Sequence, residues 1–281
     1  ERGSFRWKAP LTDYKDMDKL RFPKITVDYE ATEQRVQLAQ EIFGDLLRVG
    51  ARFSCSWHKG LSRIAANLRG LEQILYDIYD YPDELLRLMA FLRDGLLAEL
   101  DFLEENNLLF LNNRGEYVGS GGFGYTNELP ASDFAGKVRT KDLWGFAESQ
   151  ETVGISPAAF EEFVFQFQLP ILERFGLNCY GCCEPLDLRW DIVKKTPRLR
   201  RVSVSPWADW ARMAEQLQDK YIYSLKPNPA DIALPNLDEE HIRKGLREAL
   251  KITEGCVLEI IMKDVTTVGN NPQNVVDWCR I

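Results

Sequence analysis

From residue 108 to the last residue, short apolar segments alternate with longer segments in which apolar residues recur at helical spacing. This alternation predicts parallel strands joined by helices, because two neighbouring parallel strands need a long crossover between them. We therefore expect an α/β fold with a parallel sheet, either open or closed into a barrel. The predicted strands cover 108–111, 143–147, 177–180, 199–204, 221–224 and 256–261.

Helical periodicity marks the segments between these strands and much of the chain before them. Gly70 interrupts one such segment, and Pro82 and Pro157 each stand where the first turn of a helix favours proline. The predicted helices cover 31–48, 61–80, 82–106, 158–176, 208–220 and 238–252. A short strand is also predicted at 52–56. We expect residues 1–48 to form an N-terminal arm and helix, and residues 49–281 to form the main α/β domain.

Composition narrows the class of protein. Apolar residues make up 45% of the chain and charged residues 28%, which is enough for a sizeable core and argues against disorder. A net charge of −8 disfavours nucleic acid and anionic membrane surfaces as partners, because both require a basic face. No apolar run reaches the roughly 18–20 residues of a membrane span, and no signal segment opens the chain. We expect a cytoplasmic protein.

Cysteine is concentrated in one place. Of the six cysteines, Cys179, Cys182 and Cys183 fall within five residues. Adjacent cysteines rarely bridge each other because the geometry strains the peptide, so we interpret the triplet as a reduced thiolate cluster. An incidental group of small buried residues is the alternative. Cys55 and Cys279, which stand alone, are expected to serve core packing.

Polar residues follow several of the predicted strands, as in GCCEP, VSVSP, SLKPNP and IIMKDVTT. In a (β/α)₈ barrel the carboxyl ends of the strands form the active face, so these residues are candidates for a site. The catalytic candidates are Glu148, Lys263 and Asp264, and the cofactor-binding candidates are Trp57, His58, Gln150, Lys226 and Asn228. Ordinary surface charges are the alternative for each of them. The glycine-rich run GSGGFG lacks a helix opening after it, which disfavours a phosphate site.

The segments LNCYGCCEPLD, SVSPWAD, YIYSLKPNPA and EGCVLEIIMKD resemble the uroporphyrinogen decarboxylase superfamily, and most of all its branch of cobalamin-dependent methyltransferases. The resemblance covers roughly residues 50–281. It implies a (β/α)₈ barrel of the TIM-barrel type. The chain starts at Glu1 and late relative to the family, so we expect the N-terminal strands of the barrel to be missing from it.

The resemblance also implies a zinc ion held by a His-x-Cys pair and by a cysteine of the final strand. Cys256 matches the final-strand cysteine and Cys182 matches the cysteine of the pair. The histidine is replaced by Tyr180, so its role would pass to Cys179, Cys183 or Glu184, or to the distant His58.

The function implied by this resemblance is zinc-dependent transfer of a methyl group between a corrinoid and a small thiol or folate acceptor. Zinc would lower the pKa of an acceptor thiol, and methylcobalamin would be carried by a partner corrinoid protein. Two alternatives remain open. One is a metal-free decarboxylase acting on a polycarboxylate tetrapyrrole, and the other is a barrel that binds a corrinoid or tetrapyrrole without turnover. An exposed sheet edge would favour a homodimer.

Overall fold

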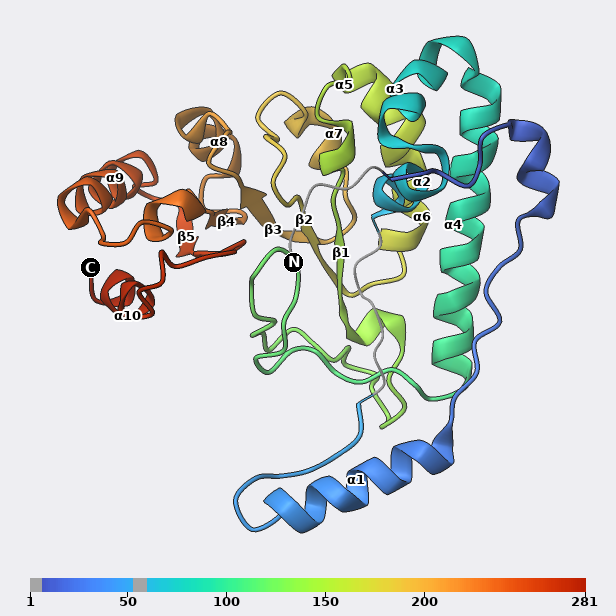
Figure 1. Ribbon diagram of the computed structural model, residues 1–281, viewed down its shortest axis with the longest axis horizontal. Coiled ribbons are helices and arrows are strands. Elements are labelled where there is room, and N and C mark those ends of the chain that lie inside the picture. The colour runs from blue at the N-terminus through green and yellow to red at the C-terminus, as the bar shows by residue number, and fades with distance from the viewer. Residues whose placement is uncertain (1–6, 53–59) are drawn as a thin grey trace.

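The computed structural model describes residues 7–52 and 60–281, and within them five strands form one parallel sheet (Figure 1). The strands are β1 (Trp144–Ala147), β2 (Leu177–Tyr180), β3 (Leu199–Val204), β4 (Ile222–Leu225) and β5 (Val257–Ile260). They lie side by side in the order of the sequence, β1-β2-β3-β4-β5. The prediction of an α/β fold with a parallel sheet is confirmed.

The sequential strand order fixes where the crossover helices lie. A right-handed crossover to the next neighbour always places its helix on the same face of the sheet. The helical segments of these crossovers are α5 (Pro157–Phe160), the π-helical η4 (Glu161–Phe165), α6 (Gln166–Leu172), α7 (Trp190–Val193), α8 (Trp210–Leu217) and α9 (Glu239–Ile252). Tyr180, Val202 and Tyr223 of the sheet share one buried cluster with Phe165 and Leu217 of these helices.

The helices before the sheet follow the prediction closely. Their bounds are α2 (Leu61–Arg69), α3 (Leu71–Asp80) and α4 (Pro82–Glu105). The break between α2 and α3 falls at Gly70, whose φ of 98° is a conformation that favours glycine. A buried ion pair secures this region, because Arg69 Nε lies 2.7 Å from Asp77 Oδ2 and Tyr14 donates a 2.6 Å hydrogen bond to the same oxygen. Tyr14 belongs to η1 (Tyr14–Lys19), so the network fastens the N-terminal arm to the helices.

The two ends of the chain carry helices of a different kind. Helix α1 (Tyr29–Phe43) has no buried residue and lies apart from the sheet (Figure 1). Helix α10 (Gln273–Arg280), which the sequence did not predict, lies on the side of β5 away from α8 and α9 (Figure 1). The remaining short turns are η2 (Thr140–Asp142), η3 (Gln150–Thr152) and η5 (Pro229–Ile232). Among the described residues, no helix combines the length and the apolar character needed to cross a membrane.

The strand predicted at 108–111 is wrong. The segment is largely buried but makes no ladder. Instead, the Asn112 side chain bonds the edge of β1, accepting from Trp144 N at 2.9 Å and donating to Trp144 O at 3.0 Å. A side-chain amide thus takes the place of a neighbouring strand at this edge. The apolar pattern predicted a strand because it indicates burial, and here burial occurs without a ladder. The strand predicted at 52–56 falls almost wholly outside the described residues.

Candidate functional site

The face of the sheet opposite the crossover helices is polar over β3, β4 and β5 and apolar over β1 and β2, where Trp144, Phe146 and Leu177 lie. Side chains alternate between the two faces along each strand, so Cys179, Arg201, Ser224 and Glu259 share the face that the helices do not cover. The glycine-rich segment 115–124 lies over this face. A Cβ added at Gly119 would meet Cys179 Cβ at 3.0 Å, and one added at Gly122 would meet Arg201 at 3.0 Å. Glycine therefore allows the loop to approach the sheet closely.

A network of charged groups occupies the centre of this face. Arg201 Nε lies 2.7 Å from Glu259 Oε1, and the Arg201 guanidinium also donates to Phe123 O at 2.8 Å and approaches Cys179 Sγ at 3.6 Å. Ser224 joins Glu259 to Lys226, since its hydroxyl contacts both side chains. Lys226 is only 1% exposed, and burial lowers its pKa to about 8.

A cluster of thiols lies at the carboxyl edge of the sheet. The Sγ atoms of Cys182 and Cys183 are 3.7 Å apart. Lys263 Nζ contacts both, 3.1 Å from Cys182 Sγ and 3.5 Å from Cys183 Sγ. The same ammonium pairs with Asp264 Oδ2 at 2.8 Å, and the Cys183 thiol donates to that oxygen at 3.3 Å. We call these four residues the thiol cluster.

The thiol cluster joins strands that are not neighbours. Cys182 follows β2 and Lys263 follows β5, and three strand spacings amount to about 14 Å in a flat sheet. A lysine and a cysteine side chain together do not reach that far. The sheet and the segment after β5 must therefore curve around the polar face, as the strands of a barrel do.

Electrostatics separates the two thiols. The contact with the Cys183 thiol and the adjacent Lys263 ammonium lower the pKa of Cys182 to about 6, against the effect of burial. The same contact, burial and the Cys182 charge raise the pKa of Cys183 well above its ordinary value. Burial alone would lower the pKa of Lys263, but its contacts with Asp264 and Cys182 raise it. Both cysteine shifts favour a thiolate at Cys182 and a thiol at Cys183, beside the Lys263 ammonium and the Asp264 carboxylate.

The carboxyl group of Glu184 stabilises the turn that carries the two thiols. Gly181 has a φ of 94°, and a Cβ there would stand 2.6 Å from Leu186 Cδ1, so the turn requires glycine. The fully buried Glu184 accepts hydrogen bonds from Cys182 N at 2.9 Å and from Ser149 N at 2.8 Å. Burial and the nearby Glu148 carboxylate raise the pKa of Glu184 to about 8. Glu184 thus positions Cys182 instead of binding a ligand.

The structure brings together several of the predicted site residues. Cys182, Cys183, Lys263 and Asp264 form the thiol cluster, and Cys179 and Lys226 lie in the network beside it. Glu148 is 1% exposed and lies below the turn, where its carboxylate accepts from Gln150 N at 2.8 Å.

Other candidates lie elsewhere. Asn228 caps η5, accepting from Ala230 N at 3.0 Å, and Gln150 begins η3. Trp57 and His58 lie outside the described residues.

The expected pairing of Cys182 with Cys256 is corrected by the structure. Cys256 precedes β5 and so lies at the amino end of the sheet, whereas Cys182 follows β2 at the carboxyl end. The Cys256 side chain packs against the helices, with Sγ 3.8 Å from Ala214 O of α8. Because the strands are parallel, the two thiols belong to opposite edges of the sheet and cannot bind one ion.

The described residues do not fit the zinc site that the resemblance implies. Nowhere in residues 7–52 and 60–281 do three or more His, Cys, Asp or Glu side chains form a group suited to a metal ion. Tetrahedral zinc sites need three or four protein ligands, and the Cys182–Cys183 pair supplies two.

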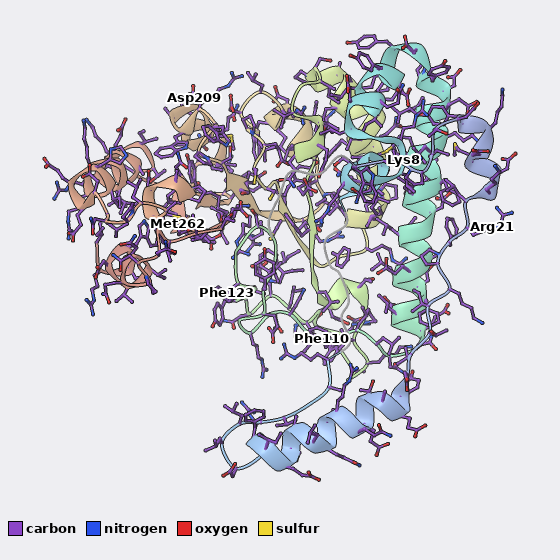
Figure 2. All side chains as sticks on the ribbon, viewed as in Figure 1. Lys8, Arg21, Phe110, Phe123, Asp209 and Met262 are labelled. Carbon is purple, nitrogen blue, oxygen red and sulfur yellow. The ribbon has the colours of Figure 1, made fainter. Side chains whose placement is uncertain are left out.

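A cavity of about 600 Å³ adjoins the charged network. Arg201 and Glu259 lie at its polar end, and Phe123, Met262 and Trp278 contribute apolar walls. Phe123 and Met262, both labelled in Figure 2, come from the glycine-rich loop and from the segment after β5. The cavity is large enough for a small molecule and is mostly apolar, as ligand sites usually are.

Sequence reasoning singled out neither Arg201 nor Glu259, and Ser224 entered it only as part of SLKPNP. A signal for them exists, because strands of a parallel sheet covered on both faces are normally apolar throughout. Polar residues at every second position of three strands mark the face that lines the site. These positions are 201-203-205, 224-226 and 259-261-263, with one exception at 261.

Compared with models of known families, with characterised proteins and with solved structures, the chain matches none of them. What the protein does has to be inferred from the chemistry of this polar face.

Proposed function

We propose that the protein is a methyltransferase that moves a methyl group between a partner's corrinoid and a small thiol acceptor, with the thiol cluster as its reactive centre. The observation that carries the proposal is the Lys263 ammonium, 3.1 Å from Cys182 Sγ at the carboxyl edge of the sheet. Methyl transfer to sulfur requires an anionic sulfur nucleophile, and an ammonium at this distance stabilises one.

The fold supports the same proposal. Consecutive order of the parallel strands and curvature around a polar face are properties of a (β/α)₈ barrel, and we propose that β1–β5 are five of its strands. In such barrels the carboxyl ends of the strands carry the catalytic groups, which is where Cys182 and Lys263 lie. We also place the protein in the cytoplasm, where reducing conditions keep Cys182 and Cys183 as thiols.

In the proposed reaction, Cys182 is the general base. An acceptor thiol reaches the partly exposed Cys182 and gives its proton to the Cys182 thiolate, so that the negative charge passes to the acceptor sulfur beside Lys263. That sulfur attacks the methyl carbon and forms the new sulfur–carbon bond. The bond between the methyl group and its carrier breaks, and its electron pair leaves with the carrier. The corrinoid of the partner protein supplies the electrophilic methyl group.

The site favours this reaction over the metal-free decarboxylase. A polycarboxylate substrate would need cations whose charge is available to it. On this face the charge of Arg201 is already matched by Glu259 at 2.7 Å. A thiolate, in contrast, has no evident use in decarboxylation.

The test uses free methylcobalamin as donor and mercaptoethanesulfonate or homocysteine as acceptor, and follows the methylated product and the absorbance of the corrinoid. We expect turnover by the native protein, an unchanged rate in Cys256→Ser, whose cysteine lies at the amino end of the sheet, and a loss of about 10²-fold or more in Cys182→Ser. Corrinoid binding without product in the native protein would overturn the proposal and support a non-catalytic binder.

A further inference from the structure

Cys182 and Cys183 form a preorganised dithiol. Side chains of adjacent residues in an extended chain point to opposite sides. Here the turn at Gly181 places both sulfurs on the same side, 3.7 Å apart, and both cysteines are partly exposed. The turn is held in place by Glu184, which binds Cys182 N.

This separation suits one soft atom bound to both sulfurs. Bonds of about 2.3 Å, the length of a zinc–thiolate bond, would bridge sulfurs 3.7 Å apart without moving the backbone. A preformed pair loses little freedom on binding, which strengthens the complex. Zinc would require further ligands, but a trivalent arsenical needs only two thiols, since its third bond is to carbon.

The neighbours of the pair suit the exchange chemistry. Lys263 Nζ, 3.1 Å from Cys182 Sγ, holds this sulfur as a nucleophilic thiolate. Asp264 Oδ2, 3.3 Å from Cys183 Sγ, accepts a hydrogen bond from the second thiol and can relay its proton.

We propose that the Cys182–Cys183 pair is a binding site for trivalent arsenicals of the type R–As(OH)₂. Two arsenic–sulfur bonds form, one to each cysteine, and two arsenic–oxygen bonds break. The two hydroxyl groups leave as water, one with the proton of the Cys183 thiol and one with a proton from solvent, because Cys182 is already a thiolate. Arsenic stays trivalent and no oxidant or reductant takes part.

The test uses phenylarsine oxide, which hydrates to such an acid, with the whole protein and no methyl donor. After one equivalent is added, the protein is washed with excess 2-mercaptoethanol, a monothiol, and its intact mass is measured. We expect one arsenical per chain in the native protein and in Cys279→Ser, and its removal by the dithiol 2,3-dimercaptopropanol. In Cys182→Ser and in Cys183→Ser, affinity should fall by about 10²–10⁴-fold, the usual cost of losing the second attachment.

Retention of the arsenical by either single variant would overturn the proposal, since another thiol pair would then be the site. Loss of the arsenical from the native protein during the monothiol wash would overturn it as well. Circular dichroism identifies any variant that fails to fold. In that case the native protein is tested instead: the arsenical should protect Cys182 and Cys183 from alkylation by iodoacetamide. Because the readout is binding, its outcome is independent of whether methyl transfer occurs.

Discussion

Replacing Lys263 by methionine should raise the pKa of Cys182. The substitution keeps a long apolar side chain and removes the ammonium that lies 3.1 Å from Cys182 Sγ. At an effective dielectric constant of about 20, two unit charges at this distance attract by about 5 kcal/mol, an upper bound because water reaches the partly exposed cysteine. A discounted effect of about 1.4–2.7 kcal/mol corresponds to one to two pKa units.

The assay is the pH dependence of alkylation of Cys182 by iodoacetamide, followed by mass spectrometry of the peptide that contains it. In the native protein the thiolate fraction should rise around pH 6, the pKa that Cys183 and Lys263 give to Cys182. In Lys263→Met the midpoint should move to between about pH 7 and pH 8. Only the midpoint is informative, because a thiolate of higher pKa is also intrinsically more nucleophilic.

Two control variants make the result specific. Lys263→Arg keeps the positive charge and should keep the midpoint within about half a unit. Lys244→Met removes an exposed lysine of α9 and should leave it unchanged. An unchanged midpoint in Lys263→Met would refute the reasoning, since Cys182 would then owe its thiolate to something other than the ammonium.

Three further predictions concern stability and metal content. Asp77→Asn breaks the buried pair with Arg69 and should lower the free energy of unfolding by about 3–5 kcal/mol in urea titrations. Asp191→Asn, at an exposed pair, should change it by under about 1 kcal/mol. Equal effects would contradict the role given to Asp77. Gly181→Ala should destabilise the folded protein by about 1–3 kcal/mol. Gly245→Ala, where a Cβ meets nothing within 4 Å, should stabilise it slightly. An unchanged stability of Gly181→Ala would show that the turn is not constrained. Elemental analysis should find well under one zinc per chain, and chelators should not alter alkylation of Cys182; a full zinc equivalent that disappears in Cys182→Ser would contradict the metal-free site.

Much of the fold was predictable because its strands are distinctly apolar and are separated by clear helical periods. The predicted strands 177–180 and 199–204 coincide with β2 and β3, and the break at Gly70 falls where expected. The prediction failed at 108–111, where apolar burial occurs without a ladder because Asn112 satisfies the edge of β1. Helix α10 was not predicted.

The site was predictable where it depends on the ends of strands. The polar residues after β2, β4 and β5 were chosen as candidates for that reason, and Cys182, Cys183 and Lys263 do converge. Their mutual contact depends on the curvature of the sheet, which no local pattern encodes. Cys256 was misjudged because motif spacing was given more weight than its position at the start of the predicted strand 256–261.

Arg201 and Glu259 show a second limit of sequence reasoning. Each lies inside a predicted strand, and their pairing at 2.7 Å joins β3 to β5 across β4. The polar residues at every second position mark one face of the sheet, but which of their side chains meet there depends on the topology.

The most direct test of the central claim is the ultraviolet absorbance of thiolate in the native protein minus that in Cys182→Ser at pH 7. The geometry of the thiol cluster predicts a difference of close to one thiolate per chain, which disappears as the pH falls through about 6. No difference at pH 7, with the signal emerging only near pH 9, the usual range of a free cysteine, would contradict the account.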